Sequence, residues 1–152
     1  MNPGTPHSYL LVRCRAWLCA LPLAEVIETL RPLPLQPVAG APAFVRGLSL
    51  VRGELVPVVE LALLLGAEGG APGRLVVVRA ATRRLALAVD AVLRIVPHEQ
   101  LPSRSVAPLL SKALPAQVTA LAVLDGAALA VLESTSVLPE EAWATLAPLI
   151  AS

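Results

Sequence analysis

Residues 42–61, PAFVRGLSLVRGELVPVVEL, consist of two apolar runs separated by one charged tight-turn sequence. The runs occupy 44–51 and 55–61, and Arg52-Gly53-Glu54 lies between them. Short apolar runs bounded by turn residues are typical of β-strands, and glycine readily adopts the positive φ of a tight hairpin turn. The stretch therefore predicts a β-hairpin with Gly53 in its turn.

Apolar runs of the same kind recur on both sides of this hairpin. They occupy 9–14, 17–26, 75–80, 85–95, 118–124 and 128–132, and Asp125-Gly126 gives a second strong hairpin signal. A proline-rich connector over 31–42 and a glycine-rich loop over 66–73 interrupt the series. Residues 139–141, Pro-Glu-Glu, suit the first turn of a helix that ends near residue 149, and 61–65 can add one short helical turn. We expect an all-β chain with a short C-terminal helix.

The strand pattern also repeats within the chain. The shift along the sequence that carries Gly53 onto Gly126 also carries Glu60 onto Glu133, and we call it the long shift. Further upstream a slightly smaller shift, the short shift, carries Ala20 onto Ala86. Repeats of this kind predict two related halves, over about 9–70 and 71–138, each forming a small barrel with closed edges, with strands open to exchange between them.

The composition is typical of a folded protein and lacks the excess of positive charge that nucleic-acid-binding proteins carry. Of its 152 residues, 56% are hydrophobic and 15% are charged, and the net charge is +1 with no basic run. Charged residues and prolines interrupt every long apolar stretch, and the polar start of the chain does not resemble a signal peptide. We therefore expect no binding of nucleic acid, no direct insertion into a membrane, and a cytoplasmic location.

The few chemically reactive residues do not form a catalytic or metal-binding pattern. Cys14 and Cys19 are five residues apart, so on one continuous strand they would point to opposite faces, and a disulfide would need a turn between them. His7 and His98 occur without a recognisable nucleophile, and no phosphate-binding glycine motif is present. We expect two buried reduced thiols, no metal, no cofactor and no enzymatic activity.

The stretch 42–61 closely resembles the signature of the CheW family, which reads in outline P-x-F-[IV]-[KR]-G-x-x-x-[LV]-R-G-x-[IV]-[VIL]-P-[IV]-[IV]-[DE]-L. Three further elements are similar in the right order: Val26-Ile27-Glu28, residues 89–92 (VDAV), and the Asp125-Gly126 hairpin. The resemblance implies one domain over 9–152, made of two five-stranded SH3-like β-barrels that share a hydrophobic core, with a C-terminal helix at about 139–150.

The resemblance also implies a role. CheW-type proteins have no active site and join the cytoplasmic signalling tips of chemoreceptors to the regulatory domain of a CheA-type histidine kinase, in arrays that can include other CheW-like proteins. A groove between the barrels takes the receptor helix, a mode that relies on apolar shape more than on charge.

The family's partner-binding positions fall on six residues of this chain: Val26, Glu28, Arg46, Gly47, Arg52 and Gly53. Each also has a structural interpretation. The valine can belong to the core, the glutamate can be a solvated strand-end charge, and the two glycines can serve the backbone. An arginine at a hairpin tip is usually just exposed, and only its motif indicates a contact.

Several residues depart from the family pattern. Leu50 replaces a common Asn, Arg15 a Gly, Cys19 an aromatic residue, Ala120 a Gly and Glu133 an Asp. None of these changes conflicts with the fold. Together they support an alternative hypothesis, in which a divergent CheW-like protein binds only one of the two partners, for example the receptor, and tunes array assembly.

Overall fold

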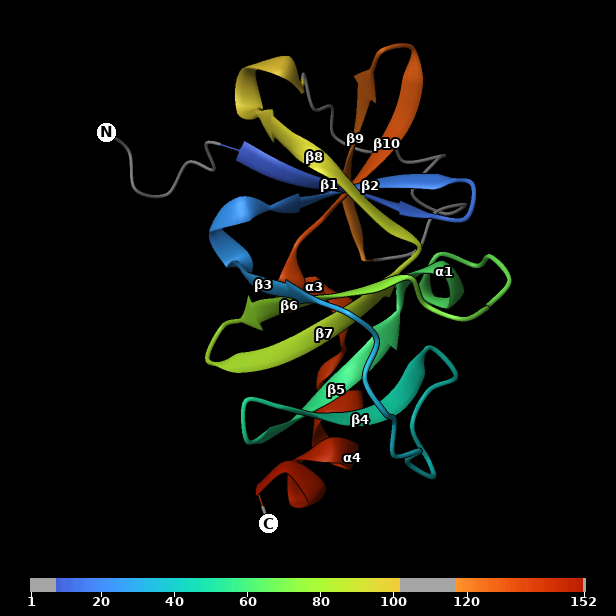
Figure 1. Ribbon diagram of the computed structural model, residues 1–152, viewed down its shortest axis with the longest axis vertical. Coiled ribbons are helices and arrows are strands. Elements are labelled where there is room, and N and C mark those ends of the chain that lie inside the picture. Colours follow the sequence, from blue (N-terminus) through green and yellow to red (C-terminus); the bar gives the residue numbers. More distant parts are fainter. Residues whose placement is uncertain (1–7, 102–116, 152) are drawn as a thin grey trace.

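Two five-stranded β-sheets form the framework of the protein, and they lie one above the other in Figure 1. The computed structural model describes residues 8–101 and 117–151. Sheet A has the strand order β8-β1-β2-β10-β9, and sheet B has the order β3-β6-β7-β5-β4. The prediction of an all-β protein is confirmed.

The strands of sheet A come from both ends of the chain, whereas those of sheet B come from its middle. Sheet A contains β1 (Ser8–Cys14), β2 (Trp17–Pro22), β8 (Ala91–Pro97), β9 (Val118–Leu124) and β10 (Ala127–Leu132). Sheet B contains β3 (Val26–Leu30), β4 (Val45–Val51), β5 (Glu54–Glu60), β6 (Arg74–Ala80) and β7 (Arg83–Val89). The helices are α1 (Leu61–Leu64), α3 (Ser134–Val137) and α4 (Glu140–Ala151), with 3₁₀ turns η1 (Leu23–Glu25) and η2 (His98–Gln100). At the C-terminal end, α4 packs near β5 of sheet B (Figure 1).

The internal repeat is visible in the positions of these elements. The short shift carries β1, β2 and β3 onto β6, β7 and β8, and the long shift carries β4, β5 and α1 onto β9, β10 and α3, to within one residue at each end. Each repeat contributes its first hairpin to the sheet that contains the last three strands of the other repeat. The predicted boundary at residue 70 therefore separates the two repeats along the sequence, but it does not separate the two sheets.

The parallel strand pairs show the same equivalence. Val131 of β10 pairs with Ala20 of β2, and Val58 of β5 pairs with Ala86 of β7. The long shift carries Val58 onto Val131, and the short shift carries Ala20 onto Ala86. The exchanged hairpins are therefore attached to the two sheets in the same way.

Two predicted strands are each split in the structure, and this corrects the sequence analysis. The run 17–26 ends as a strand at Pro22, and the run 85–95 breaks at Asp90. In both places the chain crosses from one sheet to the other. Pro22 adopts φ −55° before η1, while the Asp90 side chain accepts a hydrogen bond from the backbone N–H of Arg15 at 2.7 Å.

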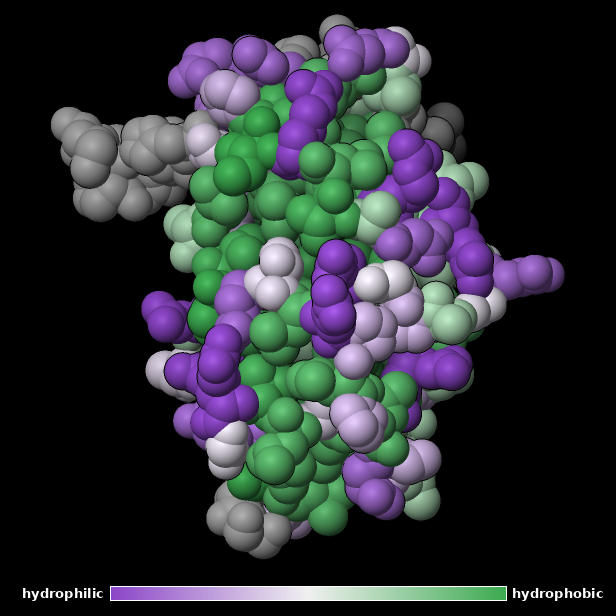
Figure 2. Space-filling view, in the orientation of Figure 1, coloured by the Kyte–Doolittle hydropathy of each residue, from purple (hydrophilic) through white to green (hydrophobic). Residues whose placement is uncertain are grey.

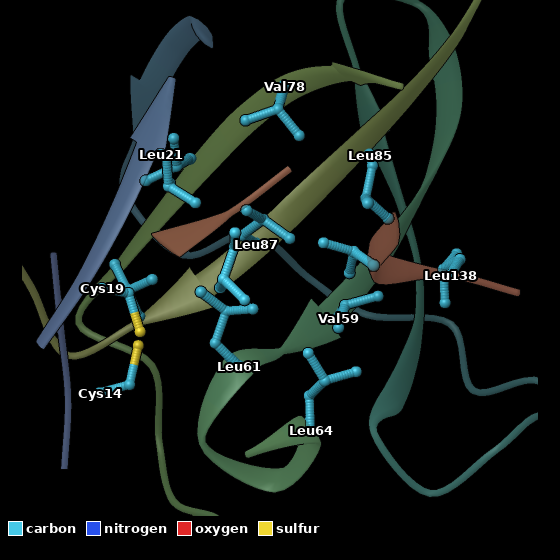
Figure 3. Close-up of a cluster of buried hydrophobic side chains, with 14 of the residues drawn as sticks. Cys14, Cys19, Leu21, Val59, Leu61, Leu64, Val78, Leu85, Leu87 and Leu138 are labelled. Atoms are coloured by element: carbon cyan, nitrogen blue, oxygen red, sulfur yellow. The ribbon is translucent and has the colours of Figure 1, made fainter. Parts of the chain in front are cut away.

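Most strands are buried on both faces, which explains their unbroken apolar runs. On β1, Leu10 and Val12 face a core shared by the two sheets, and Tyr9 and Leu11 face a second cluster within sheet A. This alternation follows the two-residue period of a strand. The shared core in Figure 3 combines side chains of both sheets with Leu138, which confirms the common core expected from the family resemblance.

The two cysteines lie in this shared core on opposite sides of a hairpin turn. Arg15 has a φ of 58° in the turn between β1 and β2, at a position where the family often has glycine. The turn brings Cys14 and Cys19 to one face, and their sulfur atoms point toward each other in Figure 3. Both are buried and free. A side-chain hydrogen bond with Cys19, together with burial, raises the pKa of Cys14 above its ordinary value of 9.0.

Candidate partner-binding site

Glu28 and Arg52, two residues singled out by the sequence, form an ion pair. Arg52 Nη2 donates to Glu28 Oε1 at 2.9 Å, and Nε donates to Oε2 at 3.3 Å. The arginine side chain is 69% exposed, and the glutamate side chain 23%. The hydrogen bonds from Arg52 hold the pKa of Glu28 below its ordinary value of 4.5, and the same contact raises the pKa of Arg52. The pair presents an oriented guanidinium at the surface.

This ion pair also connects the two edges of sheet B. Glu28 belongs to β3, and Arg52 follows β4, the strand at the opposite edge in the hydrogen-bonding order. Two edge strands can approach in this way only if the sheet curls. The pair therefore lies where the curled sheet closes.

The turn that carries Arg52 has an unusual backbone for an arginine. Its φ is 52°, and that of Gly53 is 82°. Two successive positive φ values are typical of a type I′ hairpin turn, in which a glycine is favoured. The sequence predicts a positive φ for Gly53 alone. A Cβ at Gly53 would meet no atom within 4 Å, so its requirement is conformational.

Gly47 has a different and stricter requirement. Its φ is 144°, and a Cβ there would lie 2.8 Å from the carbonyl carbon of Gln36 and closer still to its oxygen. The 31–42 connector passes at this point, where Gln36 and Leu48 exchange two backbone hydrogen bonds of 2.8 Å. The Ser49 hydroxyl donates to Pro34 O at 2.8 Å in the same region. Gly47 therefore lets the connector cover the exposed edge of β4.

Arg46 lies at the other end of β4. Its Nη1 is 4.0 Å from Glu60 Oε2, and the Glu60 side chain is only 6% exposed. Glu60 Oε1 accepts a hydrogen bond from Gly70 N at 3.2 Å, while Oε2 has no hydrogen-bond partner within the described residues. Because a buried carboxylate needs compensation, Arg46 contributes to structure as well as to surface charge.

Val26 is half-buried and packs against the shared core. Its neighbour Ile27 is 36% exposed, and Leu50, close to the Arg52 turn, is 64% exposed. The structure thus groups Glu28, Arg52 and Gly53 at one end of sheet B. Arg46 lies about 20 Å away, since a strand rises roughly 3.3 Å per residue and β4 separates the two arginines.

Sheet A contains an equivalent ion pair, which was not predicted from the sequence. Arg94 Nη2 of β8 lies 3.2 Å from Asp125 Oδ2 in the turn between β9 and β10. The short shift carries Glu28 onto Arg94, and the long shift carries Arg52 onto Asp125, so the repeat contained a signal for this pair. Beside it, Leu93 and Ile95 are 41% and 55% exposed. Figure 2 shows apolar surface around β8 and β1, bordered by hydrophilic side chains.

The described residues offer neither a metal-binding cluster nor a membrane-spanning helix. Among them, no group of three or more His, Cys, Asp or Glu side chains could hold a metal ion. No helix in the same part of the chain is sufficiently long and apolar to cross a bilayer.

The two curled, interlocked sheets define a protein of the double SH3-like class. Residues 8–142 match the family model described as CheW-like domain, and the chain belongs to the CheW-like domain family. CheW proteins, after which the family is named, are scaffolding proteins of chemotaxis signalling rather than enzymes.

A solved structure supports the fold. The scaffolding protein TtCheW from Thermoanaerobacter tengcongensis superposes with a TM-score of 0.72 at 19% sequence identity, over 84% of this chain and 89% of that one. No curated protein sequence matches this chain significantly. At this identity the likeness to TtCheW concerns the fold alone.

Proposed function

We propose that this chain is a non-enzymatic adaptor that couples chemoreceptors to a CheA-type histidine kinase. Family membership supports a scaffolding role in chemotaxis signalling. The observation that carries the proposal is the Glu28–Arg52 pair, because two family binding positions form one oriented and accessible surface feature. Both partners act at the cytoplasmic tips of receptors, so the adaptor works in the cytoplasm at receptor arrays.

The surface around this pair has the properties of a protein-binding site. Arginine is among the residues enriched at binding hot spots, and exposed apolar side chains supply area that can be buried. Leu50, two residues before Arg52, and Ile27, next to Glu28 in sequence, provide such area. A partner helix with an apolar stripe and one acceptor group would satisfy both parts of this surface.

A coupling protein must offer separate surfaces to its two partners. The family motif gives two such places in this chain, because Arg52 and Arg46 lie at opposite ends of β4. The pseudo-equivalent surface at Arg94 on sheet A adds a third place, which suits contact with a further CheW-like protein.

The direct test is a titration of the purified protein with two partners, each alone: a receptor signalling-tip fragment and a kinase regulatory domain. We expect saturable binding of both, and Arg52→Ala should weaken at least one of them several-fold. Arg74→Ala is the matched control, because Arg74 is an exposed arginine of β6 outside these surfaces. If neither partner binds, the proposal is wrong.

One observation favours the alternative of a divergent adaptor that binds only one partner. Leu50 stands where the family commonly has Asn, and it is the most exposed large apolar side chain in the described part of the chain. A leucine there would exclude a partner that expects a polar contact. The alternative predicts that one titration gives tight binding and the other does not, and that Leu50→Asn restores the weaker interaction. Equal, tight binding of both partners would dismiss it.

A further inference from the structure

A pocket of about 520 Å³ lies between the β6–β7 hairpin, the start of β5 and helix α4. Its apolar lining comes from Leu55, Trp143, Ala147 and Ile150. None of the six family binding residues lines it. The volume is within the range of pockets that bind small ligands or a small group of side chains from a partner.

Three arginines line the same pocket. Arg79 and Arg84 are directly opposite each other in the register of β6 and β7, and Arg83 is next in sequence. Like charges at directly opposite positions of a hairpin destabilise it. Among the described residues that line the pocket, Glu54 is the only acidic one, so the lining has an excess of positive charge.

Two of these arginines already contact carboxylates of the same chain. Arg83 Nη2 donates to Glu140 Oε1 at 2.7 Å, and Arg84 Nη1 lies 3.6 Å from Glu54 Oε2. The two glutamate side chains are 81% and 62% exposed, so both pairs are surface pairs that a competing carboxylate can replace. Arg79 is exposed and has no ion pair within the residues that the structure describes.

Arg83 also connects the charged and the apolar parts of the pocket. Its guanidinium carbon lies 4.2 Å from the ring centroid of Trp143, a distance typical of a cation–π contact. A ligand that binds here therefore meets cationic groups and a large aromatic surface together.

We propose that this pocket binds a partner-protein segment in which an acidic side chain lies next to a large apolar one. The carboxylate pairs with Arg79, and the apolar group packs on Trp143. Charge complementarity selects this occupant, because an arginine-rich lining favours an acidic ligand. Residues 1–7 and 102–116 of the chain itself, which lie outside the described residues, contain no Asp or Glu, so they do not supply such a ligand. The pocket is a site in addition to the receptor and kinase surfaces proposed above.

The test uses the purified full chain and the capped peptide acetyl-Glu-Glu-Leu-Phe-Glu-Glu-amide, with a matched peptide that has Gln at every Glu. The chain has two tryptophans, so Trp17→Phe leaves Trp143 as the only one, and its fluorescence reports binding in the pocket. Calorimetry with the unmodified chain gives the same measurement without this substitution. We expect saturable binding that weakens with added salt and is at least about fivefold weaker for the Gln peptide.

Three variants make the assignment specific. Arg79→Gln should weaken binding of the acidic peptide at least about fivefold, whereas Arg74→Gln, the same charge change at the far end of β6, should leave it within about twofold. Glu140→Gln should tighten binding, because it releases Arg83 from a competing carboxylate. A merely structural Glu140 would not produce this gain.

Several results would overturn the proposal. The first is equal binding of the two peptides, and the second is an equal effect of Arg79→Gln and Arg74→Gln on peptide binding. The third is binding of free glutarate that is as tight as binding of the peptide. The fourth is self-association of the chain that Arg79→Gln abolishes. The third would assign the pocket to small carboxylates, and the fourth to a second copy of this chain. No receptor or kinase enters the experiment, so its failure is distinct from failure of the adaptor function.

Discussion

Arg94 and Asp125 close sheet A with an ion pair of 3.2 Å at positions equivalent to Glu28 and Arg52 in sheet B, but with the charges reversed. The strand in one sheet carries the acid and the turn carries the base, and in the other sheet the order is inverted. Both repeats thus keep the closure while they present opposite charges at the turn. A partner that matches the Arg52 turn does not match the Asp125 turn, which makes the two ends of a duplicated protein distinguishable.

Arg52→Ala should separate binding from folding. The arginine is largely exposed and its ion pair lies at the surface, so we expect an almost unchanged melting temperature and a several-fold loss of partner binding. Thermal unfolding and titration with each partner are the measurements, and Arg74→Ala, at an exposed arginine outside the proposed surfaces, is the control. Unfolding of the variant would show that the residue is structural, and unchanged stability and binding would show that it is not a contact.

The Glu28 carboxyl should titrate below its ordinary pKa of 4.5, since hydrogen bonds from Arg52 stabilise its charged form. The ion pair's contribution to stability is therefore present above about pH 4.5 and is lost as the pH falls through the lowered pKa. NMR of the side-chain carboxyl carbon measures the titration directly. In Arg52→Ala the titration should move up toward the ordinary value, and a titration that stays in place would contradict the role of the pair.

Gly47→Ala should destabilise the protein more than Gly53→Ala. Both have positive φ, but only a Cβ at Gly47 would overlap the backbone of Gln36. We expect Gly53→Ala to cost about 1–2 kcal/mol of unfolding free energy for its left-handed conformation, and Gly47→Ala to cost more because the connector must also move. Urea unfolding of both variants measures the difference. Equal losses would mean that the connector does not depend on Gly47.

Cys14 and Cys19 should react with a thiol reagent only after the protein unfolds. Both are buried, and the raised pKa of Cys14 disfavours the nucleophilic thiolate. Because the folded pKa is raised, the contribution of this thiol to stability is complete below its ordinary value of 9.0 and decreases as the pH rises above it. Urea unfolding between pH 7 and 10 should show a smaller alkaline loss for Cys14→Ala than for the natural chain. Rapid thiol labelling of the folded protein would contradict the burial.

Local chemistry explains which parts of the fold could be predicted from the sequence. Gly53 and Gly126 mark hairpins, because a positive φ in a tight turn restricts the residue type. Asp90 carries no comparable signal. The apolar run passes through it, and the strand order of the structure shows that the chain changes sheets there, where Asp90 forms hydrogen bonds with Arg13 and Arg15.

The candidate site shows the same limit. The predicted strand over 44–51 already separates Arg46 from Arg52, but the sequence does not reveal that Glu60 is buried against Arg46. The pairing of Glu28 with Arg52 depends on the curl of sheet B, which is set by long-range strand pairing. The pocket at Arg79 and Trp143 combines a hairpin with the C-terminal helix, and no local pattern predicts that contact.

The exchange of hairpins has a consequence for synthesis of the chain on the ribosome. Sheet B is contiguous over residues 26–89, so all its strands have emerged before sheet A can be completed. The β1–β2 hairpin emerges first, but its neighbours β8 and β10 emerge last, and Ala20 must wait for Val131. Until then a nascent chain presents an apolar hairpin with two open edges, the kind of surface that pairs wrongly with other chains. Protection of the N-terminal hairpin until β8 and β10 have emerged would therefore favour correct folding.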